Sequence, residues 1–164
     1  MKLMKNHPVM QHGIAAVSFI VLIGLATDAL GANLIKWYPY EEGMALGKSD
    51  GKKTFISFYA DWCQYCRKME KQTFRDPSIV SFLNENFIAI RVDVERERRI
   101  AAQYQISPLP DTWFISENGE IIGNKPGYMT AKELLPVLYF IQTESFLSMS
   151  FPEFMNDFEG PGPR

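Results

Sequence analysis

Short apolar runs alternate with amphipathic stretches along most of the chain. Four of these runs are rich in β-branched and aromatic side chains, which is typical of buried strands. The last two are separated by Asn118-Gly119, a strong hairpin turn signal. We therefore expect four strands, at residues 54–60, 87–94, 112–116 and 120–123.

Helical spacing of apolar residues fills the segments between these strands. Asp76-Pro77 predicts a helix start, because Asp is a good N-cap and Pro suits the first helical position. Thr130 and Glu133 form a capping box that opens the last helix, and Pro136 should bend that helix. The expected helices cover residues 40–48, 63–74, 77–86, 95–104 and 130–146.

Strands that alternate with helices predict an α/β fold with a mixed sheet flanked by helices. Residues 33–50 form a lead-in segment to this fold, with the first helix inside it. We expect the tail from Ser150 to be loose. The C-terminal segment is rich in phenylalanine, at the end of the last helix and in the tail: Phe146, Phe151, Phe154 and Phe158. These side chains either cap the domain's own core, which we favour, or contact a partner.

The first 32 residues have the order of a secretory signal peptide. Lys2 and Lys5 precede an apolar run over residues 13–26, and small residues follow Asp28. The run is about 14 residues, shorter than the ~20 that a membrane-spanning helix needs. We expect cleavage near Gly31 or Ala32 and an exported, for example periplasmic, protein. An uncleaved membrane anchor is the alternative.

The composition of the chain excludes several kinds of catalysis and binding. The chain of 164 residues is 46% hydrophobic and 22% charged, with a net charge of −2, which predicts one globular domain and no nucleic-acid partner. Its only histidines, His7 and His12, lie in the predicted signal peptide. A mature chain without histidine has no Ser-His-Asp or Cys-His catalysis, and two cysteines are too few for a common zinc site. We expect no metal and no cofactor.

The two cysteines, Cys63 and Cys66, lie where a predicted buried strand meets a helix. This spacing lets the two sulfur atoms form a small disulfide ring. The helix N-terminus favours a thiolate at Cys63, which is the expected exposed nucleophile. Cys66, one turn further and better buried, is the expected resolving thiol. Two other interpretations stay open: a plain structural disulfide, and a pair of thiolates that binds a soft ion such as Cu(I).

The stretch from Tyr59 to Glu70, with Asp61-Trp62-Cys63-Gln64-Tyr65-Cys66 at its centre, resembles the active-site segment of thioredoxin-like proteins. It is most similar to the C-terminal domain of DsbD and related exported proteins. The resemblance covers roughly residues 37–142. It implies a thioredoxin fold with a central mixed sheet of four to five strands flanked by helices.

The resemblance also implies roles for further residues. Pro110 would be a cis-proline that faces the disulfide and presents the backbone of Leu109 to a substrate strand, whereas Pro108 suits a simple loop proline. Trp62 would belong to the docking surface or pack over the helix end. Glu70, four residues after Cys66 and on the same helical face, would influence cysteine protonation or simply be solvated.

One position departs from the pattern. Many thioredoxins carry a buried Asp six residues before the nucleophile, where this chain has Ser57, which cannot act as a base near neutral pH. The inner pair Gln64-Tyr65 matches neither thioredoxin nor DsbA, so it does not assign a reduction potential.

We therefore expect a signal peptide over residues 1–32, a thioredoxin-like domain over 33–148 and a tail over 149–164. The expected function is that of a monomeric thiol:disulfide oxidoreductase, a reductase or electron relay for protein thiols with a membrane donor of DsbD type. A disulfide oxidase or isomerase, and a copper-binding module without catalysis, are the alternatives.

Overall fold

The computed structural model describes residues 34–160. The predicted signal peptide and its cleavage site lie outside these residues. The elements follow in the order β1 (Trp37–Tyr38), α1 (Tyr40–Asp50), β2 (Lys53–Tyr59), α2 (Gln64–Gln72), α3 (Pro77–Asn86), β3 (Phe87–Asp93), α4 (Arg98–Gln103), β4 (Asp111–Ile115), β5 (Ile121–Pro126), α5 (Ala131–Gln142), a 3-10 turn (Ser145–Leu147) and α6 (Phe151–Asp157). Within the described part, no helix is both long and apolar enough to cross a membrane.

The sheet has five strands in the order β1-β3-β2-β4-β5. Strands β1, β3 and β2 run parallel, while β4 and β5 are antiparallel to their neighbours. The mixed sheet predicted from the sequence is thus confirmed. Strand β1 was not predicted, because its two residues are too few to show an alternating pattern and they are ordered by pairing with β3.

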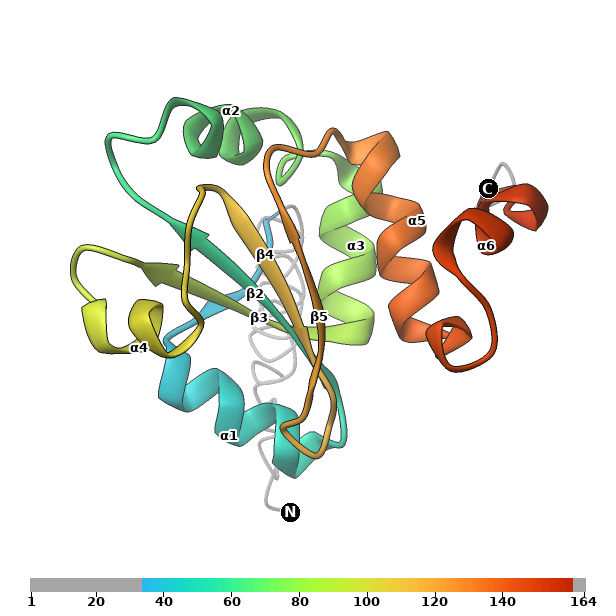
Figure 1. Cartoon of the computed structure of the whole chain (residues 1–164), viewed down its shortest axis with the longest axis horizontal. Coiled ribbons are helices and arrows are strands. Elements are labelled where there is room, and N and C mark those ends of the chain that lie inside the picture. Colours follow the sequence, from blue (N-terminus) through green and yellow to red (C-terminus); the bar gives the residue numbers. More distant parts are fainter. Residues whose placement is uncertain (1–33, 161–164) are drawn as a thin grey trace, which may run out of the picture. The chain divides into compact units, whose positions relative to one another are not determined.

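Helices cover both faces of the sheet (Figure 1). Alternate residues of the central strand β2 enter the two cores, with Phe55 on one face and Ile56 and Phe58 on the other, all three fully buried. Residues of α2, α3 and α5 pack on the Phe55 face, and residues of α1 and α4 on the opposite face. A strand that is buried on both faces is apolar along its length, which explains the unbroken apolar run of β2.

The helix starts predicted at Asp76 and Thr130 are confirmed, whereas the helix expected from Glu95 begins later, at Arg98. The Asp76 side chain accepts a hydrogen bond from the Ser78 amide at 2.9 Å, with Pro77 at the first helical position. Thr130 and Glu133 form the complete capping box of α5. Helix α5 ends earlier than expected, at Gln142, and its Pro136 is buried.

The expectation of a loose tail is wrong for residues 151–157, which form α6. Ser150 and Glu153 make a second capping box. The rings of Phe151 and Phe154 each lie 5.3 Å from the Phe140 ring of α5. The tail aromatic residues therefore pack on their own domain, which is the alternative that we favoured.

Candidate active site

The two cysteines are joined at the junction of β2 and α2. Their S–S distance is 2.10 Å and their Cα atoms lie 5.2 Å apart. Cys63 is the N-cap residue of α2, and its sulfur accepts a hydrogen bond from the Cys66 amide at 3.1 Å. A sulfur at this position accepts a hydrogen bond from a free backbone N–H group and lies near the positive end of the helix dipole.

Cys63 and Cys66 are both 5% exposed. The expectation that Cys63 is the more exposed of the two is therefore wrong for the oxidised protein. Because the bond holds both sulfurs against the same small apolar cluster, the two residues share one environment. Trp62 and Tyr65, beside them in the sequence, are 66% and 60% exposed. Most of the Trp62 side chain is open to solvent, and its two expected roles, docking of a partner and packing over the helix end, both stay predictions.

The loop before β4 borders the disulfide. Leu109 packs against the cluster that contains both cysteines. The Leu109–Pro110 peptide bond is cis, as the resemblance implied. The Ser107–Pro108 bond is also cis, which was not expected of a simple loop proline. The Pro110 carbonyl accepts a hydrogen bond from the Gly127 amide at 2.7 Å. Among residues 34–160, neither the amide nor the carbonyl of Leu109 has a backbone hydrogen-bond partner.

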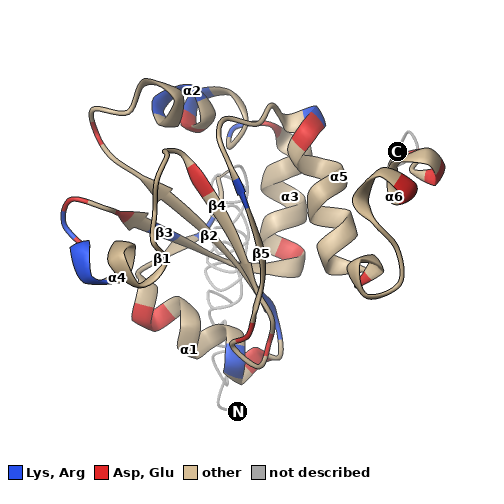
Figure 2. Ribbon diagram, in the orientation of Figure 1, with Lys and Arg blue, Asp and Glu red and all other residues tan. Residues whose placement is uncertain are grey.

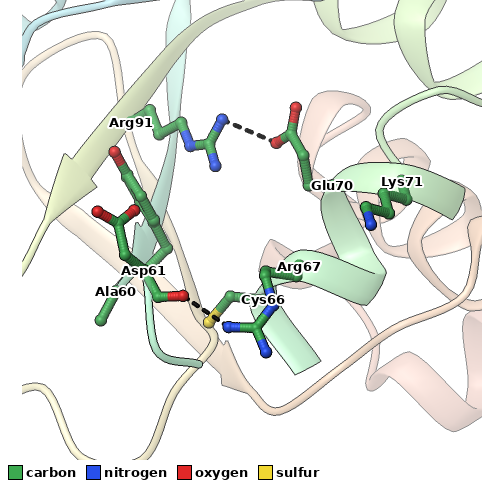
Figure 3. A pocket seen from close by; sticks show the side chains of 8 residues that line it. Ala60, Asp61, Cys66, Arg67, Glu70, Lys71 and Arg91 are labelled. Carbon is green, nitrogen blue, oxygen red and sulfur yellow. Dashed lines mark hydrogen bonds and ion pairs between the residues drawn. The ribbon is translucent and has the colours of Figure 1, made fainter. Parts of the chain in front are cut away.

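A pocket of ≈ 120 Å³ lies beside Cys66 (Figure 3). Glu70 of α2 and Arg91 of β3 both line it, and an ion pair of 2.8 Å joins Glu70 Oε2 to Arg91 Nη1. The Arg91 guanidinium also lies 4.1 Å from the ring centroid of Tyr59. The predicted position of Glu70 on the Cys66 side of α2 is thus observed, while its partner was missed.

Arg91 lies directly beside Ser57 in the sheet, because β2 and β3 pair in the register Ser57↔Arg91. Ser57 is 3% exposed and brings no carboxylate to this face. The acid next to Arg91 therefore comes from helix α2, as Glu70, and not from strand β2. The pairing could not be predicted from the sequence, because Glu70 and Arg91 are 21 positions apart. They meet only through the way that β3 pairs with β2.

A buried carboxylate that the sequence did not single out is Asp111, which follows Pro110 and is 3% exposed. It accepts hydrogen bonds from Trp113 Nε1 at 3.0 Å and from Asn124 Nδ2 at 3.2 Å. Burial raises the pKa of Asp111 above its ordinary value of 3.8, and these hydrogen bonds oppose part of the rise. The group ties the start of β4 to β5.

Within residues 34–160, no three His, Cys, Asp or Glu side chains gather in a way that would hold a metal ion.

The sequence model of the thioredoxin-like domain matches residues 40–142. The thiol:disulfide interchange protein DsbD of Vibrio vulnificus (strain CMCP6) is 32% identical over 101 residues, which is 58% of this chain and 17% of DsbD. The chain thus spans about a sixth of that relative's length.

Solved structures agree with this match. A thioredoxin from Thermus thermophilus superposes with a TM-score of 0.61 at 24% identity, over 77% of this chain and 98% of the other. The reduced DsbD C-terminal domain of Neisseria meningitidis gives a TM-score of 0.53 at 20% identity, over 62% and 92%. These likenesses establish a thioredoxin fold. The chain belongs to the thioredoxin-like disulfide oxidoreductase family, with Cys63 and Cys66 as its disulfide pair.

Proposed function

We propose that this chain is an exported thiol:disulfide oxidoreductase that reduces protein disulfides or relays electrons to them. The observation that carries the proposal is the position of Cys63 as the N-cap residue of α2. Its sulfur is bonded to the Cys66 sulfur and also accepts a hydrogen bond from the Cys66 amide. The same N–H group and helix dipole stabilise a thiolate when the disulfide is reduced.

The reaction needs only the two sulfurs of this chain. The Cys63 thiolate attacks one sulfur of a substrate disulfide, and the other substrate sulfur leaves as a thiolate. Cys66 then loses its proton and attacks Cys63 in the mixed disulfide, which forms the Cys63–Cys66 bond and releases the second substrate thiolate. The substrate gains two electrons and this chain loses two.

The Leu109 backbone supports the binding step. Its amide and carbonyl lack partners within the described residues, and its side chain contacts the disulfide cluster. An extended substrate segment can pair with them as an added strand beside Cys63. Glu70 supports the second step, because its carboxylate lines the same pocket as Cys66 and can accept the Cys66 proton through water.

Export and electron supply are further parts of the proposal. The signal-like order of residues 1–32 supports export. The likeness to DsbD, which is named as a thiol:disulfide interchange protein, supports a membrane donor of that type as the source of electrons.

Trapping of the mixed disulfide tests the catalytic part. Cys66→Ser should accumulate a covalent complex with a disulfide substrate that dithiothreitol releases, and Cys63→Ser should accumulate none. Equal trapping by both variants would contradict the assigned order of attack. Stoichiometric capture of Cu(I) by a protein that reduces no disulfide would favour the metal-binding alternative.

A redox titration tests the direction of electron flow. A reduction potential near about −270 mV, in the thioredoxin range, supports a reductase. A potential near about −120 mV, the DsbA range, would show an oxidase instead.

A further inference from the structure

The solvent side of α2 carries a row of cations beside the disulfide. Arg67, Lys68 and Lys71 are exposed and line a hollow of ≈ 520 Å³ together with Tyr65. Figure 2 shows the basic residues gathered on this helix. The row begins one position after Cys66, on the helix whose N-cap residue is Cys63.

Two tyrosines form the other part of this surface. The ring of Tyr65 lies 6.3 Å from that of Tyr128, and Lys68 Nζ lies 4.5 Å from the Tyr128 ring centroid. Tyr128 is held in place, because its hydroxyl donates to Gln72 Oε1 at 3.0 Å. The main-chain carbonyl of the next residue, Met129, accepts a hydrogen bond from the buried Thr73 hydroxyl. A surface that is ordered before binding loses less entropy when a partner arrives.

The charges of the row are not neutralised by carboxylates of the domain. Within residues 34–160, Arg67, Lys68 and Lys71 form no ion pair with an acidic side chain. Arg67 donates to the main-chain carbonyl of Asp61 at 2.6 Å. The acid within α2, Glu70, is paired with Arg91. The row thus retains its positive charge although the whole chain has a net charge of −2.

We propose that the basic strip, defined as Tyr65, Arg67, Lys68, Lys71 and Tyr128, selects protein partners whose disulfide is flanked by acidic residues. This inference rests on the proposed function and specifies its substrate class. Opposite charges around two docking sites raise the rate of encounter and suppress partners of the wrong sign. The effect weakens as salt screens the charges.

The test compares three peptides with the same intramolecular disulfide, flanked by Glu, Gln or Lys residues. The full chain is reduced with dithiothreitol, freed of it, and mixed with each peptide, and the second-order rate of exchange is measured. We expect the Glu peptide to react about tenfold faster than the Gln peptide at low salt, and the Lys peptide to be slowest. At about 0.5 M salt the rates should converge.

The matched variants are Lys68→Gln/Lys71→Gln and Lys48→Gln, the last being an exposed change on α1. The double variant should reduce the ratio of the Glu rate to the Gln rate to about threefold or less. Lys48→Gln should keep the wild-type ratio. Circular dichroism confirms that each variant is folded.

Two failures are distinguishable. Equal rates for the three peptides in the wild-type protein would overturn the basic strip and leave the oxidoreductase function standing. Absence of exchange with all three would overturn the proposed function. In that event, calorimetry measures how tightly the oxidised chain binds the same peptides with Ser in place of Cys. Tighter binding of the Glu peptide supports selection by the basic strip, and equal binding of the three peptides overturns it.

Discussion

Glu70 Oε2 lies 2.8 Å from Arg91 Nη1, across the pocket that Cys66 also lines. The two side chains come from different elements, helix α2 and strand β3, and each is 28% exposed. Arg91 is fixed in turn by the Tyr59 ring. The ion pair thus gives the Glu70 carboxylate a defined direction next to the resolving cysteine, in a domain whose Ser57 supplies no acid there.

Glu70→Gln tests whether this carboxylate takes the Cys66 proton. The substitution keeps the size of the side chain and removes its basicity, so release of the mixed disulfide should slow by about tenfold or more. The first attack, by Cys63, should keep its rate. Stopped-flow measurement of both phases between about pH 6 and pH 9 separates the steps, since the loss should be largest at low pH, where fewer Cys66 thiols are ionised.

Glu42→Gln, an exposed change on α1, is the control and should leave both phases unchanged. Equal slowing of both phases by Glu70→Gln would show that Glu70 acts on the site as a whole and not on the proton of Cys66.

Asp111→Asn should change how stability depends on pH. Burial raises the pKa of Asp111 above 3.8, so the folded protein holds this proton more tightly than the unfolded chain. The free energy of unfolding therefore falls as pH rises from the unfolded pKa through the folded pKa, and the cost persists above it. The variant lacks this titration. Its stability relative to wild type should rise with pH over that window and then level off.

Urea unfolding of both proteins between about pH 3 and pH 7 measures this difference. The exposed change Asp157→Asn, in α6, gives the background. A difference between Asp111→Asn and wild type that does not vary with pH would contradict the raised pKa.

Local signals in the sequence predicted most of the fold. The helix starts at Asp76 and Thr130 depend on residues within three positions, and each cap is observed. The same kind of signal was present at Ser150 and Glu153, so α6 could have been predicted from its capping box. Strand β1 could not, because two residues form it only by pairing with β3.

The site divides in the same way. The disulfide follows from the Cys63–Cys66 spacing and the strand–helix junction, both of which are local. The pairing of Glu70 with Arg91 depends on the register of β2 against β3, and the burial of Asp111 depends on β5 and Trp113. Periodicity carries no information on such contacts, and they were missed.

Gly43→Ala should destabilise the protein although it improves helix propensity. Gly43 lies in the middle of α1, where Ala would be favoured by about 1 kcal/mol. However, a Cβ atom there would overlap Ile90 of β3, with Cδ1 at 2.6 Å and Cγ1 nearer. Overpacking of this kind costs about 1–3 kcal/mol, which exceeds the gain in propensity, so we expect a net loss of up to about 2 kcal/mol.

Denaturant unfolding measures this loss, and Ala45→Gly is the matched control. Ala45 is exposed on the same helix, so its change should cost about 1 kcal/mol from propensity alone. If Gly43→Ala raised the free energy of unfolding, α1 would not lie as close to β3 as the structure places it.

Phe154→Ala should release α6 from the domain. A helix of seven residues is marginal without tertiary contacts, and the Phe154 ring supplies one through Phe140 of α5 at 5.3 Å. Phe154 also lies 5.2 Å from the ring of Phe158, the C-cap residue of α6, which in turn lies 5.3 Å from the Tyr139 ring of α5. Because Phe154 is only half-buried, the loss of stability should be about 1–2 kcal/mol, below the 3–5 kcal/mol typical of a buried Phe. Hydrogen exchange should show unprotected amides in α6 and unchanged protection in β2. Met155→Ala, on the exposed side of α6, should leave α6 protected. Equal loss of protection in α6 and β2 would instead make α6 part of the main cooperative unit, because a docked appendage opens without the core.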